Sequence, residues 1–329
     1  MVEPLLIATV FVSFFCTFVV LPFWIKRMKS EGLSGKDIHK LDKKKVAEAG
    51  GIVVLFGFSV GLLLYIAVKT FHFDNFSNIS QMFALLTTIL IAGMLGSTDD
   101  LLGWKRGLDN WLRVVLMVFA AVPLMVINAG THVIQGVDVG FFYPMILIPL
   151  GIVGASTTYN FLAGYNGLET SQGILILSAL ALVNYISGGS WLSIISLCMV
   201  AALAAFYIFN KYPSKIFPGD TLTYPIGAFI AIIAILGNIE QVAIFFFIPY
   251  ILETGLKVRG KLKKESFAKL NEDGSLRHPY RKIYGLEHLA IWFLKKVKPS
   301  GKVYEKEVVW SINAFQALVI LVGLWLFVI

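Results

Sequence analysis

The chain has 329 residues, of which 57% are hydrophobic and 15% are charged. Soluble domains carry about 25% charged residues, so this composition excludes an ordinary soluble domain and indicates an integral membrane protein. The formal net charge of +8 is not gathered in a soluble basic domain, so we expect no nucleic-acid partner.

Ten apolar segments are long enough, or nearly long enough, to cross a bilayer, for which a helix needs about 20 apolar residues. We therefore predict an all-α polytopic membrane protein with about ten transmembrane helices. In this interpretation residues 1–329 form a single integral membrane domain with a larger cytoplasmic loop at 257–307. In chain order, the predicted helices cover residues 4–24, 50–69, 82–98, 111–128, 142–158, 172–187, 190–209, 221–237, 240–256 and 308–328.

The Lys and Arg residues predict which ends of these helices face the cytoplasm. Of the 28 basic residues, all but Lys69 fall in four alternate hydrophilic segments. Because basic residues accumulate in cytoplasmic loops, we expect both termini outside and these four segments inside. The four basic segments are 25–49, 99–113, 210–220 and 257–307.

Two adjacent carboxylates, Asp99 and Asp100, follow the predicted helix 82–98. A charge beside a membrane-length helix is costly and usually functional, and a solvated helix end is the simpler alternative. Two neighbouring anions favour a positive partner, most simply a divalent metal ion. Lys105 and Arg106 follow the pair and are further candidate partners.

Two more motifs place oxygen-bearing side chains at the same predicted face. Asn160 and Asn166 flank a small-residue stretch, and an Asn amide can ligate Mg²⁺ or bind a base edge. Asn166-Gly167 is also an ordinary turn signal. Asp220 follows a Pro-Gly turn just before the helix 221–237, where a carboxylate either caps the helix or binds a metal or phosphate.

The two longest cytoplasmic segments are basic. Residues 35–51 mix bases, acids and glycines, and alone they indicate a juxtamembrane stretch that contacts lipid. In the segment 257–307 the Lys261–Lys264 cluster can hold a diphosphate, and Arg277-His278 and Arg281-Lys282 are rival candidates. The alternative is that these charges form a solvated face.

Together, Asp99, Asp100, Asn160 and Asp220 share one predicted membrane face with abundant Lys and Arg. Mg²⁺ typically binds one or two carboxylates and completes its shell with phosphate oxygens and water. The sequence therefore predicts a site for Mg²⁺, with Mn²⁺ as a substitute, and for a phosphorylated substrate. The main alternative from another class is a secondary transporter, whose ionisable groups lie near the bilayer midplane instead.

At these residues the sequence resembles the polyprenyl-phosphate N-acetylhexosamine-1-phosphate transferases, which are membrane enzymes of glycosyltransferase family 4. The eukaryotic and archaeal branch, which uses dolichyl phosphate, looks closest. The order and spacing of the motifs hold from about residue 34 to residue 256. The matching stretches are GKDIHK (35–40), Glu48-Ala49-Gly50-Gly51, DDLLG (99–103), NFLAGYNGLE (160–169), and FPGDT (217–221) with Tyr224.

The resemblance implies a role for each matching residue. Asn160 and Asp220 look like the Mg²⁺ ligands, while Asp99 and Asp100 look like the acidic pair at the reacting phosphates. The other assignments concern the two substrates. For the nucleotide sugar they are Ile38, Glu48, Gly164, Asn166, Phe217 and Lys264, and for the lipid phosphate Lys36, Asp37 and Lys40.

The chain departs from the family pattern at two positions. A family Lys about ten residues after the acidic pair falls on Asp109 by straight counting, and Lys105 or Arg106 can take its place. The family's basic triplet in the last cytoplasmic loop is replaced by Lys264-Glu265-Ser266. The basic residues that bind the diphosphate are therefore left open.

The implied reaction transfers GlcNAc-1-phosphate from UDP-GlcNAc to a polyprenyl (dolichyl) phosphate and releases UMP, the first step of lipid-linked oligosaccharide assembly. The alternative within the family is another UDP-sugar, such as UDP-GalNAc or UDP-MurNAc-pentapeptide. The resemblance also implies tunicamycin sensitivity and a homodimer. We expect the active site at the cytoplasmic face of the cell membrane in a prokaryote, or of the endoplasmic reticulum in a eukaryote.

The lipid phosphate has a second pKa of about 6 and is mostly dianionic at neutral pH. An obligatory general base is therefore not needed. We expect Asp99 or Asp100 to position Lys105 or Arg106, the metal or the nucleophile.

Overall fold

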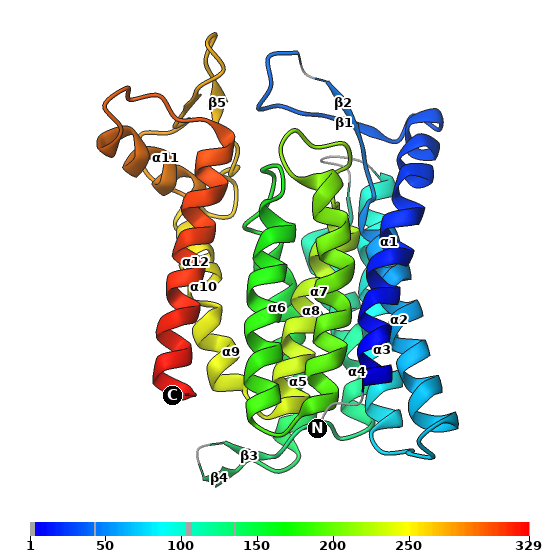
Figure 1. The fold of residues 1–329 in the computed structure, drawn as a ribbon. Coiled ribbons are helices and arrows are strands. Elements are labelled where there is room, and N and C mark those ends of the chain that lie inside the picture. Colours follow the sequence, from blue (N-terminus) through cyan, green and yellow to red (C-terminus); the bar gives the residue numbers. More distant parts are fainter. Residues whose placement is uncertain (1–3, 43, 103–106, 135, 329) are drawn as a thin grey trace.

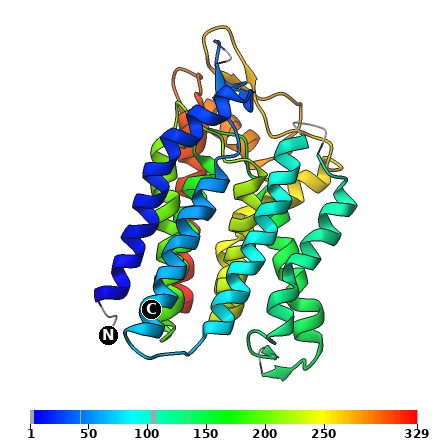
Figure 2. The same ribbon diagram turned by 90° about the vertical axis from the view of Figure 1, so that its right-hand side faces the viewer.

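A computed structural model describes residues 4–42, 44–102, 107–134 and 136–328. Long helices run side by side in one bundle, and they are accompanied by three short two-stranded hairpins (Figures 1 and 2). The helices are α1 (Pro4–Ser30), α2 (Gly51–Phe71), α3 (Ile79–Leu102), α4 (Asn110–Val126), the π-helix η1 (Tyr143–Leu147), α5 (Ile148–Tyr159), α6 (Leu168–Ile186), α7 (Ser190–Asn210), α8 (Asp220–Gly237), α9 (Glu240–Phe246), α10 (Ile248–Arg259), α11 (Leu286–Val297) and α12 (Glu305–Phe327).

The hairpins pair antiparallel strands. They are β1 (Ser34–Lys36) with β2 (Lys45–Ala47), β3 (Val133–Ile134) with β4 (Val137–Asp138), and β5 (Lys269–Leu270) with β6 (Leu276–Arg277).

The predicted polytopic helical membrane protein is confirmed. Among the described residues, seven helices are long and apolar enough to span a membrane, or eight if the bent pair α9 and α10 forms one span. Every predicted segment is helical, but α4 has 17 residues and the segment 142–158 is divided between η1 and the 12-residue α5. The count of ten crossings therefore stays a prediction.

Proline accounts for the sharpest break. The axes of α9 and α10 differ by 58°, and Pro249 is the second residue of α10. Proline has no N–H to continue the hydrogen-bond ladder, and its ring clashes with the preceding turn. The bend therefore lies where the apolar segment 240–256 was predicted to be one helix.

The two ends of the bundle differ in chemistry. Helix α1 begins and α12 ends at the same end, where the β3–β4 hairpin also lies (Figure 1). The hairpins β1–β2 and β5–β6 and the helix α11 lie at the opposite end, which we call the basic end because most of the Lys- and Arg-rich segments lie there. Helix α11 falls inside the predicted loop 257–307.

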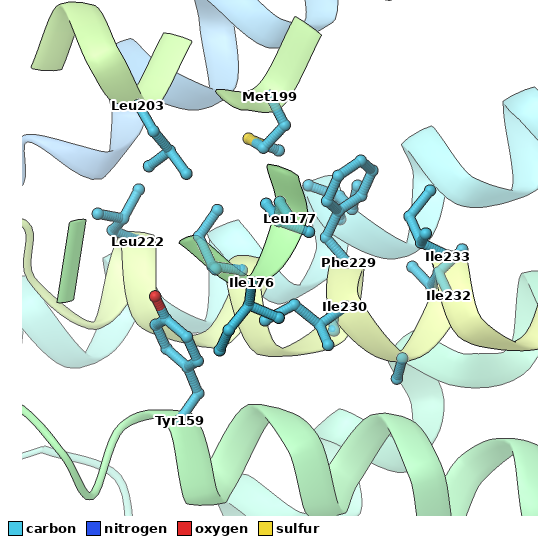
Figure 3. Packing of buried hydrophobic residues seen from close by; sticks show 14 of the residues in the cluster. Tyr159, Ile176, Leu177, Met199, Leu203, Leu222, Phe229, Ile230, Ile232 and Ile233 are labelled. Atoms are coloured by element: carbon cyan, nitrogen blue, oxygen red, sulfur yellow. The ribbon is translucent and has the colours of Figure 1, made fainter. Parts of the chain in front are cut away.

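Helix α8 is the centre of the core. Its residues Thr221–Ile235 are all buried, and Figure 3 shows its Phe229 beside Leu177 of α6 and Met199 of α7. Side chains of α8 therefore contact neighbouring helices around most of its circumference. This packing fixes the axis of α8, and with it the region in which its polar first turn lies.

Two glycines let other helices approach the start of α8. A Cβ on Gly96 of α3 would lie 2.2 Å from the backbone oxygen of Asp220, and one on Gly51 of α2 would lie 2.4 Å from the backbone nitrogen of Leu222. Those distances are shorter than any non-bonded contact, so these positions exclude larger residues.

We predict that Gly96→Ala lowers the thermal unfolding temperature in detergent, because overpacking of this kind costs about 1–3 kcal/mol. The matched control is Gly154→Ala in α5, since a Cβ there has no neighbour within 4 Å. Alanine favours helix over glycine by about 1 kcal/mol, so the control should be neutral or stabilised. Equal behaviour of the two variants would contradict the tight α3–α8 contact.

Candidate active site at the start of α8

Asp100 connects the last turn of α3 to the first turn of α8. Its Oδ1 accepts a hydrogen bond from the backbone N–H of Asp220 at 2.8 Å. Its Oδ2 accepts from the Thr221 N–H at 3.1 Å and from the Thr221 hydroxyl at 2.6 Å. The first N–H groups of a helix lack partners within the helix and carry partial positive charge. Asp100 is therefore a cap supplied from another helix.

The capping of α8 by Asp100 answers whether Asp220 caps its own helix. Asp220 was a candidate cap for its own helix, but it is the first residue of α8, and the cap residue is Gly219. A Cβ on Gly219 would lie 2.2 Å from Asp100 Oδ2, and its φ is +72°, a region that favours glycine. The Asp220 side chain is thus available for another role.

Asp99 turns to α4 instead. Its Oδ2 lies 2.8 Å from Arg113 Nε, and its Oδ1 accepts from Arg113 Nη2 at 3.3 Å and from the Leu108 N–H at 2.6 Å. The Tyr224 hydroxyl donates to Oδ2 at 3.2 Å. Asp99 is buried, whereas the Arg113 side chain is 32% exposed. The pair is an ion pair between a buried carboxylate and a partly exposed arginine side chain.

Arg113 is a site residue that sequence reasoning did not single out. Counting along the chain led to Lys105 and Arg106, which lie outside the described residues. Arg113 stands where the basic segment 99–113 overlaps the start of the predicted apolar helix 111–128, and a charge inside such a helix is itself a functional signal. That signal could have identified it.

Two more carboxylates face this junction. The Asp220 carboxylate lies within electrostatic range of Asp99, Asp100 and Arg113. Burial and then the neighbouring Asp100 raise the pKa of the Glu48 carboxyl above its ordinary value. We call Glu48, Asp99, Asp100 and Asp220 the acidic cluster. Its four carboxylates outnumber Arg113, the cation that the described residues place among them.

Asn160 faces the same turn. It ends α5, and its Oδ1 accepts a hydrogen bond from the Thr223 hydroxyl at 3.0 Å. Thr223 follows Asp220 by three residues, so the two lie on one face of α8. In the described part of the chain, no group of three His, Cys, Asp or Glu side chains has the geometry to hold a metal. A metal here would need oxygens from Asn160, substrate or water.

A second polar cluster surrounds Asn166. Its Nδ2 donates to Asp37 Oδ2 at 2.9 Å and to Glu305 Oε2 at 3.4 Å, and its N–H donates to Glu305 Oε1 at 2.7 Å. Lys40 Nζ lies 2.6 Å from Asp37 Oδ2, and the His39 and Tyr165 ring centroids lie 4.4 Å apart. We call these residues the Asn166 cluster. It joins Asp37 to Asn166, which the sequence assigned to different substrates.

Gly164 and Phe217 have mainly backbone roles in the structure. Gly164 donates its N–H to Glu169 Oε1 at 2.7 Å, and a Cβ on it would lie 2.5 Å from the Phe267 ring. The Phe217 N–H donates to the Ala47 carbonyl at 2.7 Å. A Cβ on Gly35 would lie 2.3 Å from Glu48 Oε1 and 3.4 Å from the Phe217 ring. Phe217 and Glu48 therefore line the same place.

The remaining candidates belong to neither cluster, although Lys36 and Ile38 flank Asp37 of the Asn166 cluster in the sequence. The Lys264 ammonium is 5.0 Å from the Tyr280 ring centroid and 6.0 Å from that of Tyr284. Lys36 is exposed and faces Lys45 across the β1–β2 hairpin. Ile38 is half-buried between Asp37 and His39. None of their described contacts reaches the acidic cluster.

Comparison with known proteins gives the chain its family. Residues 82–238 match the model of glycosyl transferase family 4. A Saccharolobus solfataricus protein, provisionally named UDP-N-acetylglucosamine–dolichyl-phosphate N-acetylglucosaminephosphotransferase, is 34% identical over 320 residues, which cover 94% of each chain. The Dictyostelium discoideum enzyme of that name is 30% identical over 72% of this chain and 67% of its own.

A bacterial relative is more distant. The phospho-N-acetylmuramoyl-pentapeptide-transferase of Streptococcus mutans is 26% identical and covers 96% of this chain and 97% of its own. The segment 82–238 that matches the family model contains Asp99, Asp100, Asn160, Asn166 and Asp220. This chain therefore belongs to glycosyl transferase family 4, and it is a membrane-bound phosphoglycosyltransferase.

Proposed function

We propose that the protein transfers GlcNAc-1-phosphate from UDP-GlcNAc to a dolichyl-type polyprenyl phosphate and releases UMP. The observation that carries the proposal is the acidic cluster at the start of α8, held beside Arg113. The names of the archaeal and Dictyostelium relatives support the choice of substrates. The reaction would begin the assembly of a lipid-linked oligosaccharide.

The proposed reaction exchanges one phosphoanhydride for another. An oxygen of the lipid phosphate attacks the phosphorus that carries the sugar, and the bond from that phosphorus to the UMP oxygen breaks. The sugar–phosphate bond is kept, and the electron pair leaves with UMP. The lipid phosphate, with a second pKa of about 6, is already mostly dianionic at neutral pH.

The donors at the site fit a divalent ion. Asp220 and Asn160 are the residues that would hold Mg²⁺, or Mn²⁺ in its place, and the excess of carboxylates over cations favours such binding. The bound ion would offset negative charge that develops on the departing UMP phosphate. Asp100 would fix the position of Asp220 by holding the first turn of α8.

Arg113 would bind a reacting phosphate. A guanidinium has five N–H donors. Asp99 lies 2.8 Å from Nε in the ion pair and accepts a hydrogen bond from Nη2. The Nη1 donors would then bind a phosphate oxygen. Asp99 would thus act as a positioning residue, and it also keeps Arg113 from folding away from the site.

The Asn166 cluster would bind uracil. Asp37 and Glu305 accept hydrogen bonds from the Asn166 Nδ2, which fixes the orientation of the amide. Its Oδ1 then points away from these carboxylates and can accept a hydrogen bond from the uracil N3–H. This arrangement also gives Glu305, the first residue of α12, a part in nucleotide binding.

The membrane topology is part of the proposal. The basic end of the bundle would be cytoplasmic, because basic residues accumulate on that side, and both termini would lie outside after ten crossings. The long polyprenyl tail cannot leave hydrocarbon cheaply, at about 0.8 kcal/mol per CH₂. It would therefore reach the acidic cluster laterally from the bilayer. A homodimer remains an expectation from the family.

A second candidate is the same chemistry with another UDP-sugar, such as UDP-GalNAc or UDP-MurNAc-pentapeptide. The resemblance to the Streptococcus mutans enzyme over 96% of the chain favours considering it. A secondary transporter is disfavoured, because Asp99, Asp100 and Asp220 stand at helix ends rather than near the middle of the bundle, where transporters place their ionisable groups.

The direct test is an assay with purified protein, Mg²⁺, dolichyl phosphate and radiolabelled UDP-GlcNAc, with UDP-GalNAc and UDP-MurNAc-pentapeptide in parallel. We expect labelled lipid and UMP with UDP-GlcNAc, and inhibition by tunicamycin. If labelled lipid forms only with another UDP-sugar, the assignment of UDP-GlcNAc as the donor substrate is wrong. If no labelled lipid forms and no UDP-sugar binds, the proposed transfer reaction is wrong.

We predict that Arg113→Gln lowers kcat/KM by about 10²–10³-fold, the usual effect of removing one donor that stabilises developing charge. Arg113→Lys should recover part of the activity, because the charge is restored without the planar fork. Arg27→Gln, which removes an exposed partner of Glu31, is the control. Activity within threefold of wild type in Arg113→Gln would exclude Arg113 from the site.

We predict that Asp100→Asn loses activity and stability together, because its amide presents N–H groups to the helix N–H donors of α8. A lost cap typically costs about 0.5–2 kcal/mol. Steady-state rates between pH 6.5 and 9, together with thermal unfolding, provide the measurement. Recovery of the rate at high pH would indicate that Asp100 acts as a base. Asp109→Asn, in an exposed residue without a side-chain cap bond, is the control.

We predict that Asn166→Ala raises the Kd for UDP at least tenfold, because the site loses its specific acceptor for uracil. Isothermal calorimetry with UDP measures it, and the same titration with GDP should show little change between variants. Asn271→Ala, in the β5–β6 hairpin connection, is the control. An unchanged affinity for UDP would place the uracil elsewhere.

A further inference from the structure

A pocket of about 400 Å³ lies at the basic end of the bundle, apart from both clusters. Three cations line it: Arg259 at the end of α10, and Arg281 and Lys282 in the segment before α11. The rest of the lining is His278, Tyr280, Ile283 and Trp292. It thus combines positive charge with an aromatic and apolar wall.

The three cations have no carboxylate partner among the described residues, whose ion pairs join other side chains. Burial lowers the pKa of His278 below its ordinary value, so that ring adds no charge at neutral pH. Unpaired cations around one pocket favour an anion, and guanidinium groups match the geometry of phosphate oxygens.

Helix α11 places this pocket beside apolar surface. Its buried side includes Leu286 and Ile291, while Leu289, Trp292 and Phe293 are between 39% and 53% exposed. The Lys296 ammonium lies 4.1 Å from the Trp292 ring centroid. Exposed apolar and aromatic residues with Lys beside them are typical of a helix that lies in the membrane interface.

The position of α11 also fits a helix that lies in the membrane interface. It lies across the basic end, level with the start of α12, rather than along the long helices (Figure 1). Trp292 belongs both to its exposed apolar side and to the wall of the pocket. The pocket therefore adjoins the surface that would meet the edge of the bilayer.

We propose that this pocket binds the phosphate headgroup of an anionic phospholipid of the surrounding membrane, with α11 lying in the interface. Two of its cations, Arg281 and Lys282, were rival candidates for the substrate diphosphate in the sequence. None of the lining residues has a described contact with the acidic cluster or the Asn166 cluster. The pocket is thus a lipid site distinct from the site of transfer, and it stands independently of the proposed reaction.

The test uses the double variant Arg281→Gln/Lys282→Gln in the full chain. The matched control is Lys26→Gln/Lys29→Gln, which removes two exposed charges at the end of α1. Native mass spectrometry counts phosphatidylglycerol and phosphatidylcholine that remain bound to protein in detergent. We expect the wild-type protein to retain phosphatidylglycerol in preference to phosphatidylcholine. In the double variant, the affinity for phosphatidylglycerol should fall about 25-fold, which is about fivefold for each charge removed. The control should stay within about twofold.

Two further arms distinguish the sources of phosphate. Inorganic phosphate and UDP are added to the protein with bound phosphatidylglycerol, and neither should displace it at 1 mM. Displacement by inorganic phosphate would make this a site for free anions, and a parallel loss of UDP affinity in the double variant would make it part of the nucleotide site. Either result overturns the proposal, as does equal loss of lipid in the control.

Trp292→Ala separates the apolar wall from the cations. Phosphatidylglycerol retention should fall in this variant while UDP affinity and unfolding temperature stay near those of wild type. Trp310→Ala, which removes a 71% exposed ring from α12, provides its control. Equal retention in Trp292→Ala and Trp310→Ala would show that α11 does not contribute to the lipid site.

Discussion

The hydrogen bonds from the first turn of α8 to the Asp100 carboxylate hold the site together. One side chain of α3 receives three donors from a helix 120 residues later in the chain. The partial positive charge at the helix start offsets the cost of keeping this carboxylate ionised near the bilayer. Glycines at 96 and 219 leave room for the contact. The position of Asp220 follows from it.

The same contact explains why two adjacent aspartates are useful. Consecutive residues of a helix point about 100° apart, so Asp99 and Asp100 meet different partners, and Asp99 does not bind the first N–H groups of α8. It reaches Arg113 and Tyr224 instead. One member of the pair therefore fixes a helix and its carboxylate, and the other fixes a cation. Neither geometry requires the pair to accept a proton.

The sequence predicted the helical segments well, because membrane crossing depends on the composition of a segment more than on its contacts. It could not predict the break at Pro249, because a proline in an apolar segment can also be accommodated within a helix. It treated α11 as loop, since its apolar residues are interspersed with Lys, Glu and His. Arg113 was missed because spacing along the chain does not reveal which side chain of α4 faces Asp99. The contact of Asn166 with Asp37, 129 residues apart, was missed for the same reason, because it depends on the tertiary structure.

Charge then links the two clusters to the surface around them. The substrates of a phosphoglycosyltransferase carry several negative charges, yet the carboxylates of the acidic cluster outnumber the cations described beside them. Anions would be repelled from such a cluster unless a divalent ion binds first or together with them. The basic loops around it act over about 8 Å at physiological ionic strength, which is enough to attract anions to the basic end but not to neutralise the cluster itself. Under the proposed function, attraction to the surface and neutralisation at the site would thus be separate tasks for different residues.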